Sequence, residues 1–338
     1  MIKKTFIIAE AGVNHNSKIH LAKKLVLAAK RCDANAVKFQ TFKADSLAKK
    51  NTEKVPYQKR SGKKKDTHHE MLKKLELSEK NHFILKKFCN KNKIEFISTP
   101  YSLSSIKFLE KLKTKIFKIA SADLVDHQMH TYLAKNNKRT IISTGMATMK
   151  EITETLNIYK KHNNRKVSIL HCVSNYPCSD KSLNMNNIKT LQKKFNIDVG
   201  YSDHSVGPIA SIIAVGFKCS IIERHLTLNK KMKGPDHATS SDPIEFKELV
   251  DYVRRAEKML GSYKRSVQSE ERKMRIVSRK SLIYKKNFFK GYKITSEDIS
   301  SIRPGKYILG NQIKRVIGKR LRKDVIKDAF VKYKHIKN

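Results

Sequence analysis

The sequence predicts an α/β protein, a (β/α)8 TIM barrel followed by a small β-rich domain. Eight short apolar runs alternate with helical periodicity between residues 6 and 260. No GxGxxG loop follows the first run, which argues against an open nucleotide-binding sheet. After about Ser262 the pattern changes to short β-like runs broken by glycine and proline. The 338 residues are enough for one barrel of about 250 residues and a further small domain.

The predicted strands start apolar and end polar, as in a barrel with a packed floor and a reactive mouth. Alternate residues of a strand face opposite sides, so Ile8 shares a face with Glu10, and Lys38 shares one with Gln40. The same alternation turns Lys118 inward. The predicted strands are residues 6–11, 36–40, 95–99, 116–120, 140–143, 167–171, 199–202 and 220–225. Predicted helices include residues 19–32, 78–92, 103–113, 150–161 and 244–260.

Three segments follow from this pattern. We expect the barrel domain at residues 1–265, a charged linker at 266–280 and the small β-rich domain at 281–338. A small domain of this size is marginally stable by itself, so we expect it to dock on something. The charged insertion at residues 43–74 is predicted to be a solvated loop, with a lid over the mouth as the alternative.

Composition fits an enzyme that stays in the cytoplasm. The hydrophobic fraction is 39%, and no stretch approaches the roughly 20 apolar residues of a membrane span. The start, MIKKTFIIAEAG, turns polar too soon for a secretory signal. The 5 cysteines form no CxxC pair, which favours reduced thiols. We expect no membrane association.

The net charge of +43 is the unusual feature of the composition. Such a balance is typical of proteins that bind nucleic acid or anionic membranes. The lysines are spread over nearly every segment, however, without a basic motif interleaved with aromatic residues. We therefore expect solvated basic faces, a field that favours an anionic small substrate, and no specific nucleic-acid partner. A basic nucleic-acid-binding protein is the less favoured alternative.

Two lysines inside apolar strands are the strongest chemical signal. Burying an ammonium group is costly, so Lys38 and Lys118 need anionic partners. Together with nearby hydroxyl groups they would form a cradle for phosphate or carboxylate. One alternative is a Schiff-base aldolase that uses one lysine covalently. Another is purely structural pairing of the lysines with Glu10 and Asp123. The hydroxyl groups of this predicted cradle belong to Thr99, Ser121 and Ser143.

Two histidines close the last two predicted strands. His204 stands beside Asp203, and His225 stands two residues after Glu223. Two imidazoles with oxygen ligands and open positions suit a divalent ion, Mn²⁺ or Mg²⁺. Such an ion would act as a Lewis acid on a substrate carbonyl.

Polar loops after other strands supply further candidates. The segment HCVSNYP places Ser174 and Tyr176 just after the sixth strand. The segment GPDHATS places Asp236 after the last strand, where its carboxylate could bind sugar hydroxyls or act as a base. Turn formation alone is the structural alternative for these loops.

The chain resembles the sialic acid synthase family, the phosphoenolpyruvate-condensing synthases of N-acetylneuraminate, N,N'-diacetyllegionaminate and related acids. Eleven matching stretches occur in order along essentially the whole chain, and together they are highly specific. They are IAEAGVNHN (8–16), AVKFQTFKAD (36–45), MLKKLELSE (71–79), ISTPYS (97–102), KIAS (118–121), ISTGMAT (142–148), HCVSNYP (171–177), GYSDHS (200–205), IERHLTL (222–228), GPDHATS (234–240) and IRPG (302–305).

The resemblance implies condensation of phosphoenolpyruvate with an N-acetylmannosamine-type sugar, with release of phosphate by C–O cleavage. It implies His204 and His225 as metal ligands. It also implies a catalytic set and a substrate-binding set. The catalytic set is Glu10, Lys38, Lys118 and Asp236. The substrate-binding set is Gln40, Thr99, Ser121, Asp123, Ser143, Ser174, Tyr176, Ser202 and Arg303.

The tail is similar to the antifreeze-like (SAF) domain of that family. The resemblance implies a homodimer in which this domain crosses to the partner subunit and brings Arg303 to the acyl group of the sugar. Two stretches depart from the family pattern. KIASAD carries Ala122 where the family usually has glycine, followed by the shorter acid Asp123, and the tail reads RPGKYILG rather than an RPGNGIS-like turn.

Overall fold

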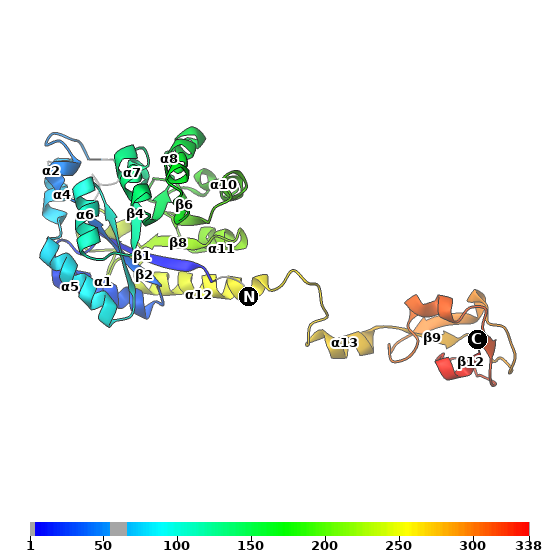
Figure 1. Cartoon of the computed structure of the whole chain (residues 1–338). Helices are drawn as coiled ribbons and strands as arrows, with labels where there is room; N and C mark the ends of the chain where they lie inside the picture. Colours follow the sequence, from blue (N-terminus) through cyan, green and yellow to red (C-terminus); the bar gives the residue numbers. More distant parts are fainter. Residues whose placement is uncertain (1–3, 55–65, 338) are drawn as a thin grey trace. The chain divides into compact units, whose positions relative to one another are not determined.

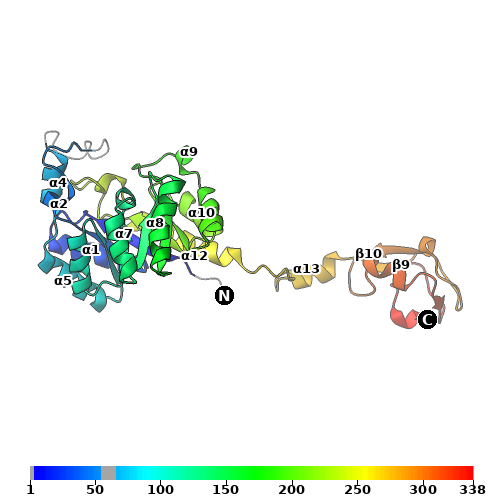
Figure 2. The same cartoon turned by 45° about the horizontal axis from the view of Figure 1, so that its top comes forward.

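A computed structural model describes residues 4–54 and 66–337 of the chain. The chain divides after Gly261 into two compact units, Met1–Gly261 and Ser262–Asn338. Figures 1 and 2 label the elements of both units from two directions. Among the described residues, no helix is long and apolar enough to cross a membrane.

The first unit is a closed barrel of eight parallel strands, as the sequence predicts. The strands pair in chain order from β1 to β8, and β8 returns to pair with β1. Every predicted strand end agrees with the structure to within one residue. The strands are β1 (Phe6–Gly12), β2 (Ala36–Thr41), β3 (Glu95–Pro100), β4 (Ile116–Ile119), β5 (Arg139–Ser143), β6 (Val167–Cys172), β7 (Val199–Asp203) and β8 (Ile221–His225).

The predicted alternation of side chains is confirmed by the two apolar layers of the barrel. Inside, a small cluster fills the floor and includes Ile8, Ile116 and Ile221. Outside, the residues of opposite parity, such as Val37 and Phe117, pack against the helices. Because strand side chains alternate strictly, an apolar residue at the floor places the residue two positions later nearer the mouth.

Helices surround the barrel, and α1 lies beside α5 in both views. The five helices predicted from periodicity are present as α1 (Ile19–Arg31), α5 (Glu79–Lys91), α6 (Leu103–Lys111), α8 (Met149–Lys161) and α12 (Pro243–Leu260). Capping boxes begin α8 at Thr148 and α12 at Asp242. The sequence did not single out α7 (His127–Lys135), α9 (Asp180–Leu183), α10 (Asn187–Phe195) and α11 (Ile209–Gly216).

The insertion at residues 43–74 is folded at its described ends. It forms α2 (Ala44–Leu47) and α4 (His68–Leu75), while residues 55–65 lie outside the described part. Leu72 and Leu75 pack with Val13 and Phe42 in a separate apolar cluster. The expectation of a solvated loop is therefore wrong for these ends, because the leucine spacing of a short amphipathic helix was hidden among the charges.

The second unit has its own apolar core. It contains α13 (Glu271–Ser278) and strands β9 (Ser281–Tyr284), β10 (Ile299–Ile302), β11 (Arg320–Leu321) and β12 (Ile336–Lys337). The strands form two antiparallel pairs, β9 with β10 and β11 with β12. The predicted linker thus carries α13, whose Ile276 carbonyl accepts a hydrogen bond from the Gly305 amide at 2.7 Å. The core residues are Leu282, Tyr284, Phe288, Ile294, Ile299, Ile308, Val316, Leu321, Val325, Val331 and Ile336.

Candidate active site at the carboxyl end of the barrel

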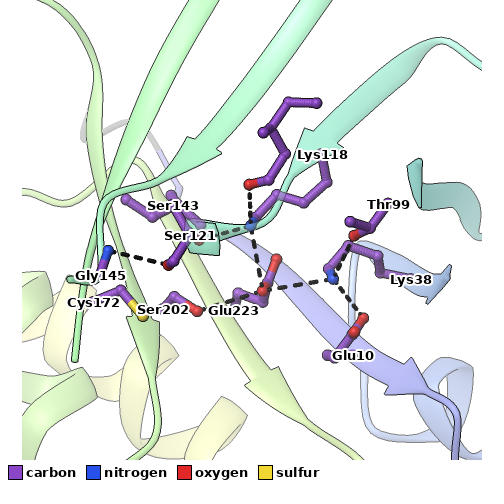
Figure 3. Close-up of polar contacts among 12 residues, drawn as sticks. Glu10, Lys38, Thr99, Lys118, Ser121, Ser143, Gly145, Cys172, Ser202 and Glu223 are labelled. Carbon is purple, nitrogen blue, oxygen red and sulfur yellow. Dashed lines mark hydrogen bonds and ion pairs between the residues drawn. The ribbon is translucent and has the colours of Figure 1, made fainter. Parts of the chain in front are cut away.

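Polar side chains from several strands meet at the mouth of the barrel (Figure 3). Lys38 comes from β2 and Lys118 from β4, and both are buried. Glu10 of β1 and Glu223 of β8 supply the carboxylates. All four follow the floor residues by alternation, since Ile8 precedes Glu10 and Ile221 precedes Glu223 by two positions.

The two lysines are neutralised by two buried glutamates. Lys38 Nζ lies 2.7 Å from Glu10 Oε2 and 3.7 Å from Glu223 Oε1. Lys118 Nζ lies 3.8 Å from the same Glu223 oxygen. Burial acts to lower the pKa of Lys38, but Glu10 and Glu223 raise it above its usual value. Burial lowers the pKa of Lys118 in spite of Glu223.

Three hydroxyl oxygens of the site each accept a hydrogen bond from an N–H group of the protein. Lys38 donates to Thr99 Oγ1 at 3.1 Å, and Lys118 donates to Ser143 Oγ at 2.6 Å. The Gly145 amide donates to Ser121 Oγ at 3.0 Å. A hydroxyl that already accepts such a bond keeps its own proton for another acceptor. These three side chains can therefore donate to an anion beside the lysines.

Gly145 leaves room for this arrangement. A Cβ at position 145 would overlap Ser174 Oγ, lie 2.9 Å from Ser121 Oγ and lie 3.3 Å from Cys172 Sγ. The absence of a side chain there lets the backbone amide approach Ser121. The loop positions of Ser121 and Ser174 therefore depend on glycine.

A second group of polar atoms surrounds Gly12. Gln40 Nε2 donates to Glu10 Oε1 at 3.2 Å. A Cβ on Gly12 would lie 3.2 Å from Glu10 Oε1 and 3.6 Å from Asp236 Oδ2, so the two carboxylates share one side of the mouth. Burial, and then the charge of Glu10, raise the pKa of Asp236 to about 7. Asp236 can thus gain or lose a proton near neutral pH.

The two histidines and Tyr176 form a ring cluster. The ring centroids of His204 and His225 are 5.7 Å apart, and Tyr176 lies 4.0 Å from the first and 5.4 Å from the second. His204 donates from Nδ1 to the Val173 carbonyl at 2.8 Å, so Nε2 is the acceptor nitrogen when the ring is neutral. Burial acts to lower the pKa of His204, but Cys172 raises it above its usual value. Ser202 Oγ lies 3.4 Å from that Nε2.

This pair fits a divalent ion. Burial holds the pKa of His225 well below its usual value, so the ring is neutral, as a metal ligand must be. Its buried Nδ1 has no hydrogen-bond partner among the described residues. Across residues 4–54 and 66–337, no group of three or more His, Cys, Asp or Glu side chains is arranged to hold an ion. Further ligands of an ion at this pair would come from substrate or water.

Several sequence-predicted residues lie elsewhere than the lysine cradle. Asp203, which stands beside His204 in the sequence, faces the outer layer and pairs with Arg224 at 3.1 Å. Asp123 lies in a 3-10 turn after β4, where burial and Asp126 raise its pKa to about 6. Lys118 pairs with Glu223 rather than Asp123. Arg303 belongs to the second unit, where its Nε donates to the Ser278 carbonyl at 2.9 Å.

Three residues of the site were not assigned a role in the lysine cradle from the sequence, although Glu223 was noted beside His225. Glu223 shares the parity of Ile221 and His225, so the alternation already placed it inward. Cys172 likewise ends β6 on the inward face, with Sγ 3.6 Å from His204 Nδ1. Gly145 lies beyond β5, where alternation gives no information.

The sequence matches the NeuB family over residues 25–265. The chain belongs to the NeuB family. It is 41% identical to the N,N'-diacetyllegionaminic acid synthase of Legionella pneumophila over 98% of this chain and 94% of that protein. It is 33% identical to the human N-acetylneuraminate-9-phosphate synthase over 76% of this chain and 71% of that protein. The resemblance to sialic acid synthases is thereby confirmed, and the protein is an enzyme of the synthase type.

Solved structures agree with this NeuB assignment. The N-acetylneuraminic acid synthetase of Leptospira borgpetersenii, solved with citrate, has a TM-score of 0.71 and 32% identity, covering 80% of this chain and 90% of that one. A spore coat polysaccharide biosynthesis protein E from Chromobacterium violaceum, described as putative, has a TM-score of 0.82 and covers 99% of this chain and 100% of that one. At 20% identity, the second likeness shows the fold alone.

Proposed function

We propose that this NeuB-family enzyme condenses phosphoenolpyruvate with an N-acetylated amino sugar, giving a nonulosonic acid and phosphate. The observation that carries the proposal is the buried pair Lys38 and Lys118, each donating to a hydroxyl whose proton remains for a bound anion. Phosphoenolpyruvate has two anionic ends, which suit two separate ammonium groups. The family membership supports the same reaction class.

We propose a 2,4-diacetamido sugar as the acceptor. Relatives from Legionella pneumophila and Campylobacter jejuni at 41% and 39% identity are named N,N'-diacetyllegionaminic acid synthases, a product with two acetamido groups. A pseudaminic acid synthase from Campylobacter jejuni is 34% identical, and the human N-acetylneuraminate-9-phosphate synthase is 33% identical. N-acetylmannosamine and its phosphate are the alternatives.

The phosphoenolpyruvate end of the site is assigned to the cradle already described. Lys38 and Lys118 bind the phosphate and carboxylate, and the free hydroxyl protons complete the contacts. Glu223 sits between the two ammonium groups and offsets their charge when no anion is bound. The proposed hydroxyl donors are Thr99, Ser121, Ser143 and Ser174, with Ser202, whose hydroxyl donates to Glu223 Oε1 at 3.4 Å until an anion replaces that carboxylate.

The sugar end is assigned to the carboxylates around Gly12 and to the ring cluster. Glu10 and Gln40 are joined by a hydrogen bond and accept or donate to sugar hydroxyls. Tyr176 lies against His204 and is assigned to the sugar side with it. Asp236, with its pKa raised to about 7, carries a proton to or from the sugar. Asp123 is proposed as a further substrate contact on the side of Lys118, whose charge acts on it.

His204 and His225 would hold the metal, Mn²⁺ or Mg²⁺. When bound, the ion supplies a Lewis acid for the aldehyde oxygen of the open-chain sugar. The neutral His225 ring and the available Nε2 of His204 support this assignment.

The proposed reaction balances without a redox partner. A new bond forms between C3 of phosphoenolpyruvate and the aldehyde carbon, and the oxygen of a water molecule adds to C2. The bond between C2 and the bridging oxygen then breaks, so phosphate leaves with that oxygen. Of the two protons of the water, one ends on the new sugar hydroxyl and one on phosphate. The chain's part is to orient the reactants and to carry the proton at Asp236.

The Schiff-base alternative is favoured by one observation, the lowered pKa of Lys118. Its geometry argues against a free amine, since Nζ donates to Ser143 Oγ at 2.6 Å and to the Ile119 carbonyl at 3.0 Å. These two bonds, together with Glu223 Oε1 at 3.8 Å, favour the ammonium form, which is not a nucleophile. Borohydride added with phosphoenolpyruvate or the keto-acid product should leave no adduct. A mass increase localised to Lys38 or Lys118 would establish the aldolase instead.

We further propose that residues 281–338 form an antifreeze-like (SAF) domain that crosses to the partner in a homodimer and presents Arg303 to the acyl group of the sugar. The order of motifs along the chain and the exposure of Arg303 support this. Mixing subunits carrying Arg303→Ala with subunits carrying Lys118→Ala should restore part of the activity. Mixed dimers without recovery would show that Arg303 acts in its own chain or not at all.

The decisive experiment measures phosphate release from phosphoenolpyruvate with a panel of 2-acetamido and 2,4-diacetamido sugars, with and without Mn²⁺. We expect turnover that needs both a sugar and the metal, fastest with the 2,4-diacetamido sugar. Release of phosphate without any sugar, or none with every sugar, would contradict the proposed condensation.

A further inference from the structure

The loop that carries Asp236 is joined to the loop after β1 by buried side chains. The first loop runs from Leu226 to Ser241, and the second covers residues 13–18. Asn14, His237 and Ser240 are each at most 1% exposed, although they lie in loops or, for His237, in a single 3-10 turn. Buried polar groups are nearly always hydrogen-bonded, so the partners of these three side chains show which parts of the two loops they hold in place.

One relay ends on the backbone of Asp236 itself. Asn14 Nδ2 donates to the Leu226 carbonyl at 2.9 Å and to Ser240 Oγ at 2.9 Å. Ser240 Oγ in turn donates to the Asp236 carbonyl at 2.6 Å. The hydroxyl thus accepts from one loop and donates within the other, which defines the direction of both bonds.

A second relay holds His237, the residue that follows Asp236 in the chain. His237 Nδ1 lies 2.6 Å from Thr227 Oγ1, and its Nε2 lies 3.4 Å from Asn16 Oδ1. Asn16 Nδ2 donates to the Lys233 carbonyl at 2.9 Å, so its Oδ1 is the acceptor and His237 Nε2 carries the proton. Burial lowers the pKa of His237 to about 4, which keeps the ring neutral with one donor and one acceptor.

We infer that Asn14, His237 and Ser240 are positioning residues that hold Asp236 against Glu10 on the sugar side of the mouth. The inference rests on the proposed function for the role of Asp236. Neither relay touches the lysine cradle, because their bonds end on Asp236, Leu226, Thr227 and Lys233. Losing a relay should therefore impair use of the sugar while leaving phosphoenolpyruvate binding in place.

The test compares Ser240→Ala with Ser241→Ala in the full-length enzyme. Ser241 is a matched control because it is adjacent and equally buried, but its Oγ accepts from Arg224 Nε at 3.0 Å instead of contacting Asp236. For Ser240→Ala we expect the sugar KM to rise about tenfold, the size of one lost buried hydrogen bond, with the phosphoenolpyruvate KM within twofold of wild type. Ser241→Ala should leave the ratio of the two KM values unchanged.

His237→Phe, which keeps an aromatic ring, though a larger one, and removes both hydrogen bonds, should shift the same ratio in the same direction. Amide hydrogen exchange should also become faster across residues 234–240 in both relay variants. Equal effects on both substrates, or a Ser240→Ala enzyme that matches Ser241→Ala, would overturn the positioning role. A wild-type enzyme that condenses no amino sugar would instead overturn the proposed function and the sugar-side role with it.

Discussion

Glu223 Oε1 lies 3.8 Å from Lys118 Nζ, and both side chains are buried. The same oxygen lies 3.7 Å from Lys38 Nζ, so one carboxylate offsets two ammonium groups. Burial acts to raise the pKa of Glu223, but Lys118 and Lys38 lower it below its usual value and keep it ionised. A bound anion would compete with this carboxylate for the lysines.

Glu223→Gln is therefore expected to destabilise the protein without substrate by about 3 kcal/mol, because two buried lysines lose a counter-charge. Phosphoenolpyruvate should raise the Tm of the variant more than that of wild type, since its charge replaces the missing one. Thermal unfolding with and without phosphoenolpyruvate measures both effects. Glu154→Gln is the control, because Glu154 is an exposed partner of Lys150 at 4.0 Å and should change stability little. A stabilised Glu223→Gln protein would contradict the charge argument.

Gly145→Ala should weaken phosphoenolpyruvate binding at least tenfold. The added methyl group overlaps Ser174 Oγ and crowds Ser121 Oγ at 2.9 Å, so the hydroxyl groups must move. Steady-state KM values for the two substrates measure the effect. Gly216→Ala is the control, because nothing lies within 4 Å of its added Cβ. An unchanged phosphoenolpyruvate KM in Gly145→Ala would remove Ser121 and Ser174 from the cradle.

Chelation should abolish turnover, and Mn²⁺ should restore it. His204→Ala and His225→Ala should each lose activity by more than a hundredfold while far-UV circular dichroism is retained. His20→Ala, on the exposed face of α1, should behave as wild type. Calorimetry with Mn²⁺ alone provides a second measurement, since both site variants should lose the binding seen in wild type. Full activity after exhaustive chelation would exclude the metal assignment.

Stability should fall in mild acid because His130 is buried as the neutral ring. Burial lowers its pKa to about 4 from the model-peptide value of 6.5, and its Nδ1 contacts the Tyr159 hydroxyl at 3.0 Å. Between these pH values the unfolded chain binds the proton and the folded chain does not, so stability is present above pH 6.5 and is lost toward pH 4. By pH 5 this one group should have lowered the free energy of unfolding by about 2 kcal/mol relative to its value at neutral pH.

Urea unfolding of wild type and His130→Phe at pH 7 and pH 5 measures this contribution. The variant loses the Tyr159 hydrogen bond at both pH values, but its stability should change less between them. His127→Ala is the control, because His127 is exposed at the start of the same helix. Identical pH dependence in wild type and His130→Phe would contradict the argument.

Strand alternation explains why so much of the site was predictable. It predicted from the sequence alone that Glu10, Lys38 and Lys118 face the interior of the barrel. The same rule applied to Glu223, but only the structure shows that this carboxylate is the shared counter-ion of Lys38 and Lys118. Gly145 was not predicted, because side-chain alternation applies only within a strand and β5 ends at Ser143. In the same way, α11 was missed because its residues are apolar all round, which removes the periodic contrast that marks a helix.

The relays between the two loops were beyond prediction for a different reason. Asn14 and Ser240 are 226 positions apart, and only closure of the barrel between β1 and β8 brings them together. Their residue types are also common in turns, so each has a local explanation until the partner is known.

The closure of the barrel by pairing of β8 with β1 has a consequence for synthesis of the chain. The ribosome completes Lys38 and Lys118 long before it reaches Glu223, so a nascent chain that ends ahead of β8 holds two strand lysines without the carboxylate they share. Such a chain also exposes the unpaired edge of β1. The arrival of residues 221–225 therefore supplies the shared counter-charge of the two lysines and covers the unpaired edge of β1 in one late step. A chain released before that step would expose both, and would therefore be prone to aggregate unless a chaperone bound it.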